Sequence, residues 1–399
     1  MPEPTDTGPR PEGKPSGPAP KLVALDALRG IAFLAVFSFH AYGITPGLPG
    51  WITATLSQGY FGVELFFCLS ALTLCMSWDA RRAGESRPYL AYLVRRFFRI
   101  APLFYLAILG YRLSGWNDAG PAAIAATVTF THGFLPATIN RVVPGCWSIA
   151  DEMLFYLFMP WLFFHLTTTR RALLATAGAY GVGALASRLV RRAAIGAGVP
   201  GYLASDFGWY WLPAQLGWFL LGITLYRLLR PRLRGEQAPG PRDRATSAAL
   251  LLGALALAVG GIAGVLPAKN VLSMGVIAGL VAGLVLHPWP LLVNPATRML
   301  GIWSFSAYLT HFAALEAARR LGLEATGRPP LVSLGLVAVV GLSMTAAASA
   351  LLSRLVERPG IRLGSMVVAR LKARAGPVAA PRTLDEVPAG AQPLPTHPG

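Results

Sequence analysis

The chain has 399 residues, of which 54% are hydrophobic and only 13% are charged, and its mean hydropathy is +0.51. Soluble domains carry about 25% charged residues, so a soluble enzyme, a disordered scaffold and a disulfide-framed secreted domain are excluded. The net charge is +17, but the arginines cluster at the ends of apolar segments. That placement is typical of membrane orientation and contact with anionic lipids, so we expect membrane lipids and not nucleic acid as partners.

Ten apolar segments approach the roughly 20 residues that a transmembrane helix needs. In chain order they are residues 22–42, 60–78, 100–113, 147–166, 172–189, 209–229, 248–266, 271–286, 302–318 and 331–352. A further apolar stretch, 122–135, is short and is open to three interpretations: an eleventh span, a re-entrant hairpin or a surface helix. The flanking segments 1–20 and 371–399 are rich in small residues and proline and are predicted to be disordered tails. The transmembrane domain is therefore expected over residues 21–370.

The basic loops favour ten spans with both termini in the cytoplasm. This arrangement places the arginine-rich loop 230–245 inside, as the positive-inside rule requires, whereas an eleventh span would move it outside. Arginine outnumbers lysine, and Ala, Gly and Pro abound, a bias typical of GC-rich bacterial genomes. We therefore predict an all-α, polytopic bundle of about ten helices in the bacterial cytoplasmic (inner) membrane.

Several ionisable side chains fall within these apolar segments. A charge at mid-membrane costs about 2.5–3.5 kcal/mol on insertion scales, so such residues indicate function by default. They are Asp26, Arg29, His40, Glu64, Asp151, Glu152 and His311. Together they predict a polar cavity inside the bundle.

Arg29 and His40 form the most informative pair. Eleven residues at about 100° each place both side chains within about 20° of one helix face, about 16 Å apart along the axis. A guanidinium binds phosphate in forked geometry, and an imidazole accepts a proton near neutral pH. The pair thus matches a long substrate with a phosphorylated end and a distant reactive carbonyl. The alternative is structural: Arg29 pairs with Asp26, and His40 satisfies a neighbouring helix.

The other polar positions have similar alternatives. Arg95, Arg96 and Arg99 share a helix arc of about 100° and either hold nucleotide phosphates or anchor the helix by snorkelling; spacing alone favours the anchor. Glu152 follows Ser148 at the start of an aromatic-rich segment. It either positions a hydroxyl, pairs with an arginine, or occupies a solvated helix N-terminus, where carboxylates are favourable.

Two further side chains are read more simply. Glu64 is equally consistent with a packed, protonated carboxyl, and His311 with a satisfied core histidine. The histidines show no metal-ligand spacing, so we predict no metal and no permanently bound cofactor.

Six motifs in order resemble acyltransferase family 3 of integral membrane acyltransferases, over roughly residues 21–365. The first is Leu-Asp-Ala-Leu-Arg-Gly-Ile-Ala at 25–32 followed by His40, similar to the family's Arg-x10-His signature. The second is Gly-Val-Glu-Leu-Phe-Phe-Cys-Leu-Ser at 62–70, with Ala71 where the family usually has Gly. The remaining four are Arg-x-x-Arg at Arg96 and Arg99, Trp-Ser-Ile at 147–149 with Glu152, Ser-Ala-Tyr-Leu-Thr-His at 306–311, and Glu-Arg-Pro at 357–359.

The resemblance implies an O-acyltransferase that moves an acyl group, usually acetyl, from acyl-CoA to a hydroxyl of a sugar-containing acceptor. The expected catalytic residues are then His40 as the base, Glu152, which orients His40 or the acceptor, and Arg29, which with Arg95, Arg96 and Arg99 holds the phosphorylated end of acetyl-CoA, the co-substrate. Asp26, Glu64, Ser148 and His311 are expected to line the same polar cavity. The favoured acceptor is a glycosylated natural product, in antibiotic biosynthesis; the alternatives are a cell-surface polysaccharide or a lipid-linked glycan. A membrane transporter of a glycoconjugate is the rival from another class.

Overall fold

Every regular element of the computed structural model is helical. The structure describes residues 20–265, 269–324 and 327–374, and this part contains no strand, as the sequence predicts. The predicted tails, 1–20 and 371–399, lie almost wholly outside the described residues. At their inner edges, Pro20 begins the first helix and the last helix continues to Arg374.

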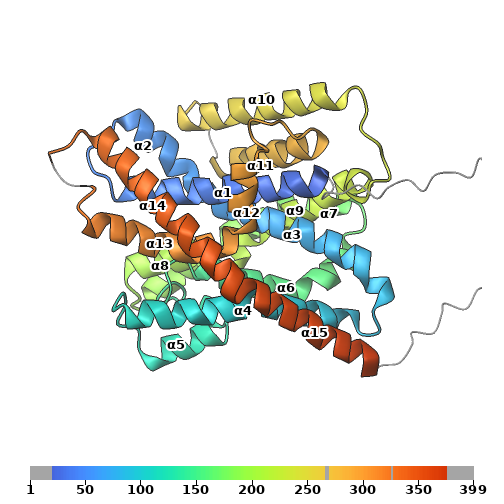
Figure 1. Ribbon diagram of the computed structural model, residues 1–399, viewed down its shortest axis with the longest axis horizontal. Coiled ribbons are helices and arrows are strands. Elements are labelled where there is room, and N and C mark those ends of the chain that lie inside the picture. Colours follow the sequence, from blue (N-terminus) through green and yellow to red (C-terminus); the bar gives the residue numbers. More distant parts are fainter. Residues whose placement is uncertain (1–19, 266–268, 325–326, 375–399) are drawn as a thin grey trace, which may run out of the picture.

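The helices, in chain order, have the following bounds: α1 Pro20–Gly43, α2 Gly50–Leu56, α3 Phe61–Arg81, α4 Pro88–Leu113, α5 Pro121–Val128, α6 Trp147–His165, α7 Thr169–Gly196, α8 Gly201–Tyr210, α9 Leu212–Arg234, α10 Asp243–Ile262, α11 Lys269–Leu286, α12 Pro295–Ile302, α13 Ser304–Arg320, α14 Pro330–Leu352 and α15 Arg358–Arg374. A π-helical turn, Ser353–Glu357, joins α14 to α15, and the three form one long rod across the molecule (Figure 1).

Three predicted segments differ from the observed helices. The short span at 100–113 is the second half of α4. The first half of this helix carries the arginines, so its hydropathy is too low for it to be predicted as part of a span. The segment 122–135 coincides with most of the eight-residue α5 and a 3-10 turn at His132–Phe134, both too short to cross a bilayer. The segment 302–318 is divided at Trp303 between α12 and α13.

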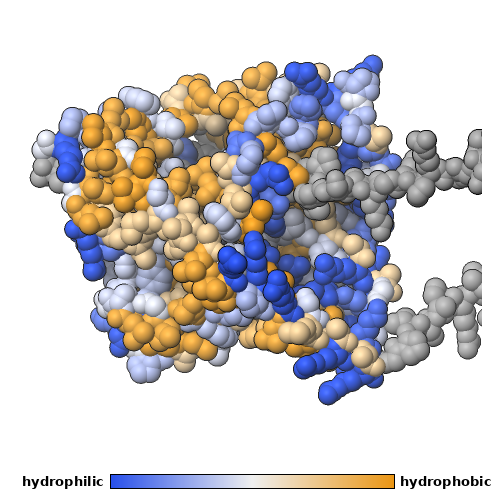
Figure 2. Space-filling model, in the orientation of Figure 1, coloured by the Kyte–Doolittle hydropathy of each residue, from blue (hydrophilic) through white to orange (hydrophobic). Residues whose placement is uncertain are grey.

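Large hydrophobic side chains are exposed on many helices of the bundle. Six helical segments of the described residues are long and apolar enough to cross a membrane: Val23–Gly43, Gly50–Gly84, Thr169–Gly196, Gly201–Arg234, Asp243–Ile262 and Pro330–Arg374. Hydrophobic side chains cover much of the face shown in Figure 2, and hydrophilic ones gather toward the end where α15 finishes. The start of α1 lies at that same end (Figure 1). Ten spans and a cytoplasmic location of both termini remain predictions.

Helix α1 lies in the interior of the bundle, where it packs on α3, α12 and α13. Its contact with α12 is made through backbone. A Cβ built on Gly301 would lie 1.7 Å from the carbonyl oxygen of Asp26, and one built on Gly30 would lie 1.9 Å from that of Thr297. Small residues allow such close helix crossings in membranes. The crossing fixes α1, which carries Arg29 and His40, against the start of α13.

Candidate active site

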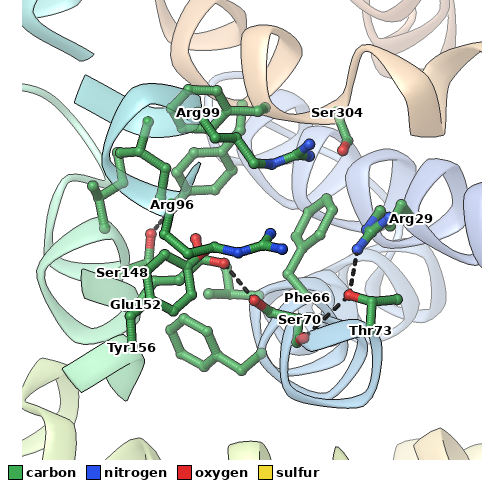
Figure 3. Close-up of a pocket in the computed structure, with 16 residues that line it drawn as sticks. Arg29, Phe66, Ser70, Thr73, Arg96, Arg99, Ser148, Glu152, Tyr156 and Ser304 are labelled. Atoms are coloured by element: carbon green, nitrogen blue, oxygen red, sulfur yellow. Dashed lines mark hydrogen bonds between the residues drawn. The ribbon is translucent and has the colours of Figure 1, made fainter. Parts of the chain in front are cut away.

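Three arginines converge on one cavity of about 260 Å³, which we call the arginine cavity. Arg29 comes from α1, and Arg96 and Arg99 come from adjacent turns of α4; Figure 3 shows all three side chains around the cavity. Its other polar lining side chains are Ser70, Thr73, Ser148, Glu152, Tyr156, Ser304 and Tyr308. Three guanidiniums against one carboxylate make the cavity net positive, as a site for a phosphorylated ligand requires.

Each arginine is held differently. The guanidinium of Arg29 donates a hydrogen bond to the Thr73 hydroxyl at 2.8 Å and lies 3.9 Å from the carboxylate of Asp26. Arg96 reaches Ser77 at 3.5 Å and lies over the Tyr92 ring. Arg99 makes no hydrogen bond or salt bridge with any described residue. The two α4 guanidiniums are therefore available to a ligand, and the structural pairing of Arg29 with Asp26 is a long one.

Glu152 belongs to the arginine cavity and accepts a hydrogen bond from the Ser70 hydroxyl (Figure 3). Both residues sit within the motifs on α6 and α3. The structure does not bring Glu152 to His40, which lines a different cavity. Glu152 therefore faces the arginines, and the expected orientation of His40 by this carboxylate has no contact among the described residues to support it.

Arg95 is also placed away from the cavity. Its guanidinium forms two hydrogen bonds with the carboxylate of Glu85, at 2.7 and 3.0 Å. The residue shares an arc of α4 with Arg96 and Arg99, but the turn after α3 supplies a carboxylate that takes up its charge. The phosphate-binding role expected for Arg95 is therefore not supported by its position.

His40 lines a second cavity of about 400 Å³, which we call the aromatic cavity. Its walls include the rings of Phe39, Tyr60, Trp147, Trp209, Tyr210, Tyr308 and Phe312. The Trp147 and Tyr210 rings are stacked, with centroids 4.5 Å apart. The polar groups here include His40 and Asn140, so the cavity combines flat apolar walls with a potential proton acceptor.

The two cavities meet at Val63 and Tyr308, which line both. The Tyr308 hydroxyl is held at this partition by Ser148, at 2.9 Å, and by the carbonyl oxygen of Gly145, at 3.0 Å. Gly145 has φ +79°, and a Cβ on it would lie 2.8 Å from that hydroxyl. The single polar cavity expected from the sequence is therefore two, with Arg29 in one and His40 in the other.

Of the further residues expected to line the polar cavity, only Ser148 does so. Asp26 lies beside the cavity, next to Arg29. Glu64 is 1% exposed on α3, lines neither cavity, and has one carboxyl oxygen without a hydrogen-bond partner among the described residues. His311 is fully buried and contacts His40, with ring centroids 5.3 Å apart. No group of three or more potential metal ligands occurs in the part of the chain that the structure describes.

The residues that the sequence analysis left without a role are Ser70, Thr73, Tyr156 and Tyr308, together with the aromatic walls. Ser70 and Tyr308 lie within the motifs at 62–70 and 306–311, so the motifs carried a signal for them. The other aromatic walls, such as Trp209, Tyr210 and Phe312, carried none, because α8 and the middle of α13 meet only in the folded chain.

The sequence motifs that supply both cavities also decide the family. A family model described as an acyltransferase domain, that of acyltransferase family 3, matches residues 22–348. The chain belongs to acyltransferase family 3. The chain is also similar to acyltransferase MdmB of Streptomyces mycarofaciens. The two sequences are 27% identical over 376 residues, which cover 86% of this chain and 92% of the relative. No solved structure matches this family 3 chain. The predicted family is thus confirmed, and both arginine and histidine of the Arg-x10-His signature line cavities.

Proposed function

We propose that the chain is an acyl-CoA-dependent O-acyltransferase of the bacterial inner membrane, which transfers an acetyl group to a hydroxyl of a sugar-containing acceptor. The observation that carries the proposal is the placement of three converging arginines and one histidine in two cavities that meet at Tyr308. Membership of an acyltransferase family supports acyl transfer; the donor, the acceptor and the location are our inferences.

Acetyl-CoA enters the arginine cavity with its phosphates toward Arg29, Arg96 and Arg99. Guanidiniums form forked, charge-assisted hydrogen bonds with phosphate oxygens, and Arg99 has no described partner to give up. The uncharged pantetheine arm then extends toward Val63 and Tyr308. This places the thioester at the partition, within reach of the aromatic cavity.

In the aromatic cavity, His40 takes the proton of the acceptor hydroxyl as the oxygen attacks the thioester carbonyl. The tetrahedral intermediate collapses by breaking the carbon–sulfur bond, and the CoA sulfur leaves with the proton that His40 returns. General-base catalysis of this kind contributes about 10²–10⁴-fold. Positioning of the two substrates on either side of Tyr308 supplies part of the remainder.

The aromatic cavity is suited to a sugar ring. Flat aromatic faces pack against the C–H face of a pyranose, and indole and phenol groups retain a polar edge for its hydroxyls. Trp147, Trp209 and Tyr210 provide such faces. We favour a glycosylated natural product, such as an antibiotic sugar, as acceptor; a surface polysaccharide or a lipid-linked glycan presents the same ring.

The test uses purified protein in lipid nanodiscs with [1-14C]acetyl-CoA and extracts of glycosides and glycans from a deletion strain. Mass spectrometry of that strain identifies the acceptor by its missing acetyl mass. Wild-type protein should release free CoA only with acceptor, in equal amount to labelled product. His40→Ala should lose at least about 10²-fold in rate. His165→Ala is the matched control, because His165 is exposed and bonded to its own helix at Trp161.

Two results would overturn the proposal. Full transfer by His40→Ala removes the base, and counterflow of the glycoconjugate in proteoliposomes without CoA release indicates a carrier instead of an enzyme.

A further inference from the structure

His311 is a buried histidine whose protonation is fixed by its own helix. Its Nδ1 lies 2.8 Å from the carbonyl oxygen of Tyr308. A carbonyl oxygen only accepts, so Nδ1 carries the hydrogen. In the neutral ring, Nε2 then presents a lone pair. That nitrogen is buried and has no hydrogen-bond partner among the described residues, an arrangement that proteins rarely leave unsatisfied.

Of the rings that contact His311 in the part of the chain that the structure describes, His40 alone has an N–H donor without a partner. His311 also contacts Phe33, Phe312 and the Tyr308 ring. The phenylalanines have no donor, and the Tyr308 hydroxyl is engaged with Ser148 and Gly145 at the partition. The His40 ring also contacts Phe39 and Phe312, with centroids 5.0 and 4.4 Å away.

We propose that His311 is a positioning residue for His40. The Nε2 of His311 accepts a hydrogen bond from one ring nitrogen of His40, so that the second, unprotonated ring nitrogen of His40 points into the aromatic cavity. The rings lie 5.3 Å apart between centroids and are not hydrogen-bonded in the structure; catalytic hydrogen bonds often close only when substrates bind. The inference rests on the proposed function, because a base needs a fixed lone pair.

This arrangement has the same logic as other base-and-orienter pairs, in which a third group selects the tautomer of the catalytic imidazole. Here the orienter is a neutral imidazole in place of a carboxylate. It fixes the ring without burying a negative charge among Phe33, Phe39 and Phe312.

The experiment is 15N magic-angle-spinning NMR of the full chain, labelled at histidine, in lipid nanodiscs. The chain has six histidines, so His40 and His311 are assigned by the signals lost in H40Q and H311Q. We expect His311 as the Nδ1–H tautomer and His40 as one tautomer with a through-hydrogen-bond correlation to His311 Nε2, with CoA bound if not before. In H311L, the NMR signals of His40 should show a mixture of its two tautomers. In H311Q, the glutamine amide oxygen lies near the position of the His311 Nε2, so His40 should again be a single tautomer.

The controls separate this contact from folding and from catalysis. The buried His132, bonded to the carbonyl oxygen of Cys146 at 2.9 Å, should keep its signals in both variants if the bundle is intact. H311L should lower kcat by at least about tenfold, but by less than loss of the base, without changing KM for acetyl-CoA. A mixture of His40 tautomers in wild type with CoA, or a single tautomer in H311L, would overturn the inference. The NMR readout needs no acceptor, so it is independent of the His40→Ala result that decides the proposed function.

Discussion

Replacing Gly301 by Ala should destabilise the bundle and misplace Arg29. The new Cβ would lie 1.7 Å from the Asp26 carbonyl oxygen, so α1 and α12 must separate by more than about 1.3 Å to reach even 3.0 Å. Overpacking of this kind costs about 1–3 kcal/mol. Asp26 is one turn from Arg29, and a displacement near 1 Å in an enzyme site can cost about 10²-fold in rate.

The assay compares Gly301→Ala with Gly335→Ala, since Gly335 is also helical but faces open space on α14. Thermal unfolding in nanodiscs should show Gly301→Ala melting several degrees below the control, at a few degrees per kcal/mol, and kcat/KM for acetyl-CoA should fall only in Gly301→Ala. Equal melting temperatures and equal kcat/KM in the two variants would show that the backbone contact is dispensable and refute the reasoning.

Three further predictions concern the two cavities. Gly145→Ala should slow transfer by displacing Tyr308, whereas Gly115→Ala, at a similar φ of +69° but in open space, should cost only stability by about 1–2 kcal/mol; rates and melting curves distinguish them. Arg99→Ala should raise KM for acetyl-CoA, whereas Arg95→Ala should not, because Arg95 is paired with Glu85; initial rates against donor concentration test this. Added salt should raise KM for acetyl-CoA but not for acetyl-pantetheine, which lacks the phosphates; an equal effect on both would contradict phosphate binding by the arginines.

Local sequence signals predicted the helices that are apolar throughout. The first, third and sixth helices begin and end within a few residues of the predicted spans, because lipid-facing and core-facing positions are both apolar there. Only the second half of α4 was predicted as a span, because Arg95, Arg96 and Arg99 lower the hydropathy of the first half. These charged side chains are tolerated because they face a cavity or an ion-pair partner. No local feature of the sequence marks the break between α12 and α13 at Trp303.

The site was predictable only as far as one helix determines it. Helical periodicity put Arg29 and His40 on one face of α1, and each lines a cavity. Which residues meet across helices is set by packing. His311 contacts His40 although they are 271 positions apart in the sequence, and Ser70 donates a hydrogen bond to Glu152, 82 positions away. For the same reason spacing on α4 could not separate Arg95 from Arg96, because the difference comes from Glu85 in the preceding turn.

The partition at Val63 and Tyr308 has a consequence for the cell's permeability barrier. An enzyme that joins a substrate on one side of a bilayer to one on the other must avoid becoming a leak for protons and ions. On the proposed reaction, Val63 and Tyr308, which line both cavities, lie between the donor and the acceptor and so restrict such a leak. Only the two-carbon acetyl group then passes from one cavity to the other, while the bulky nucleotide carrier stays in the arginine cavity.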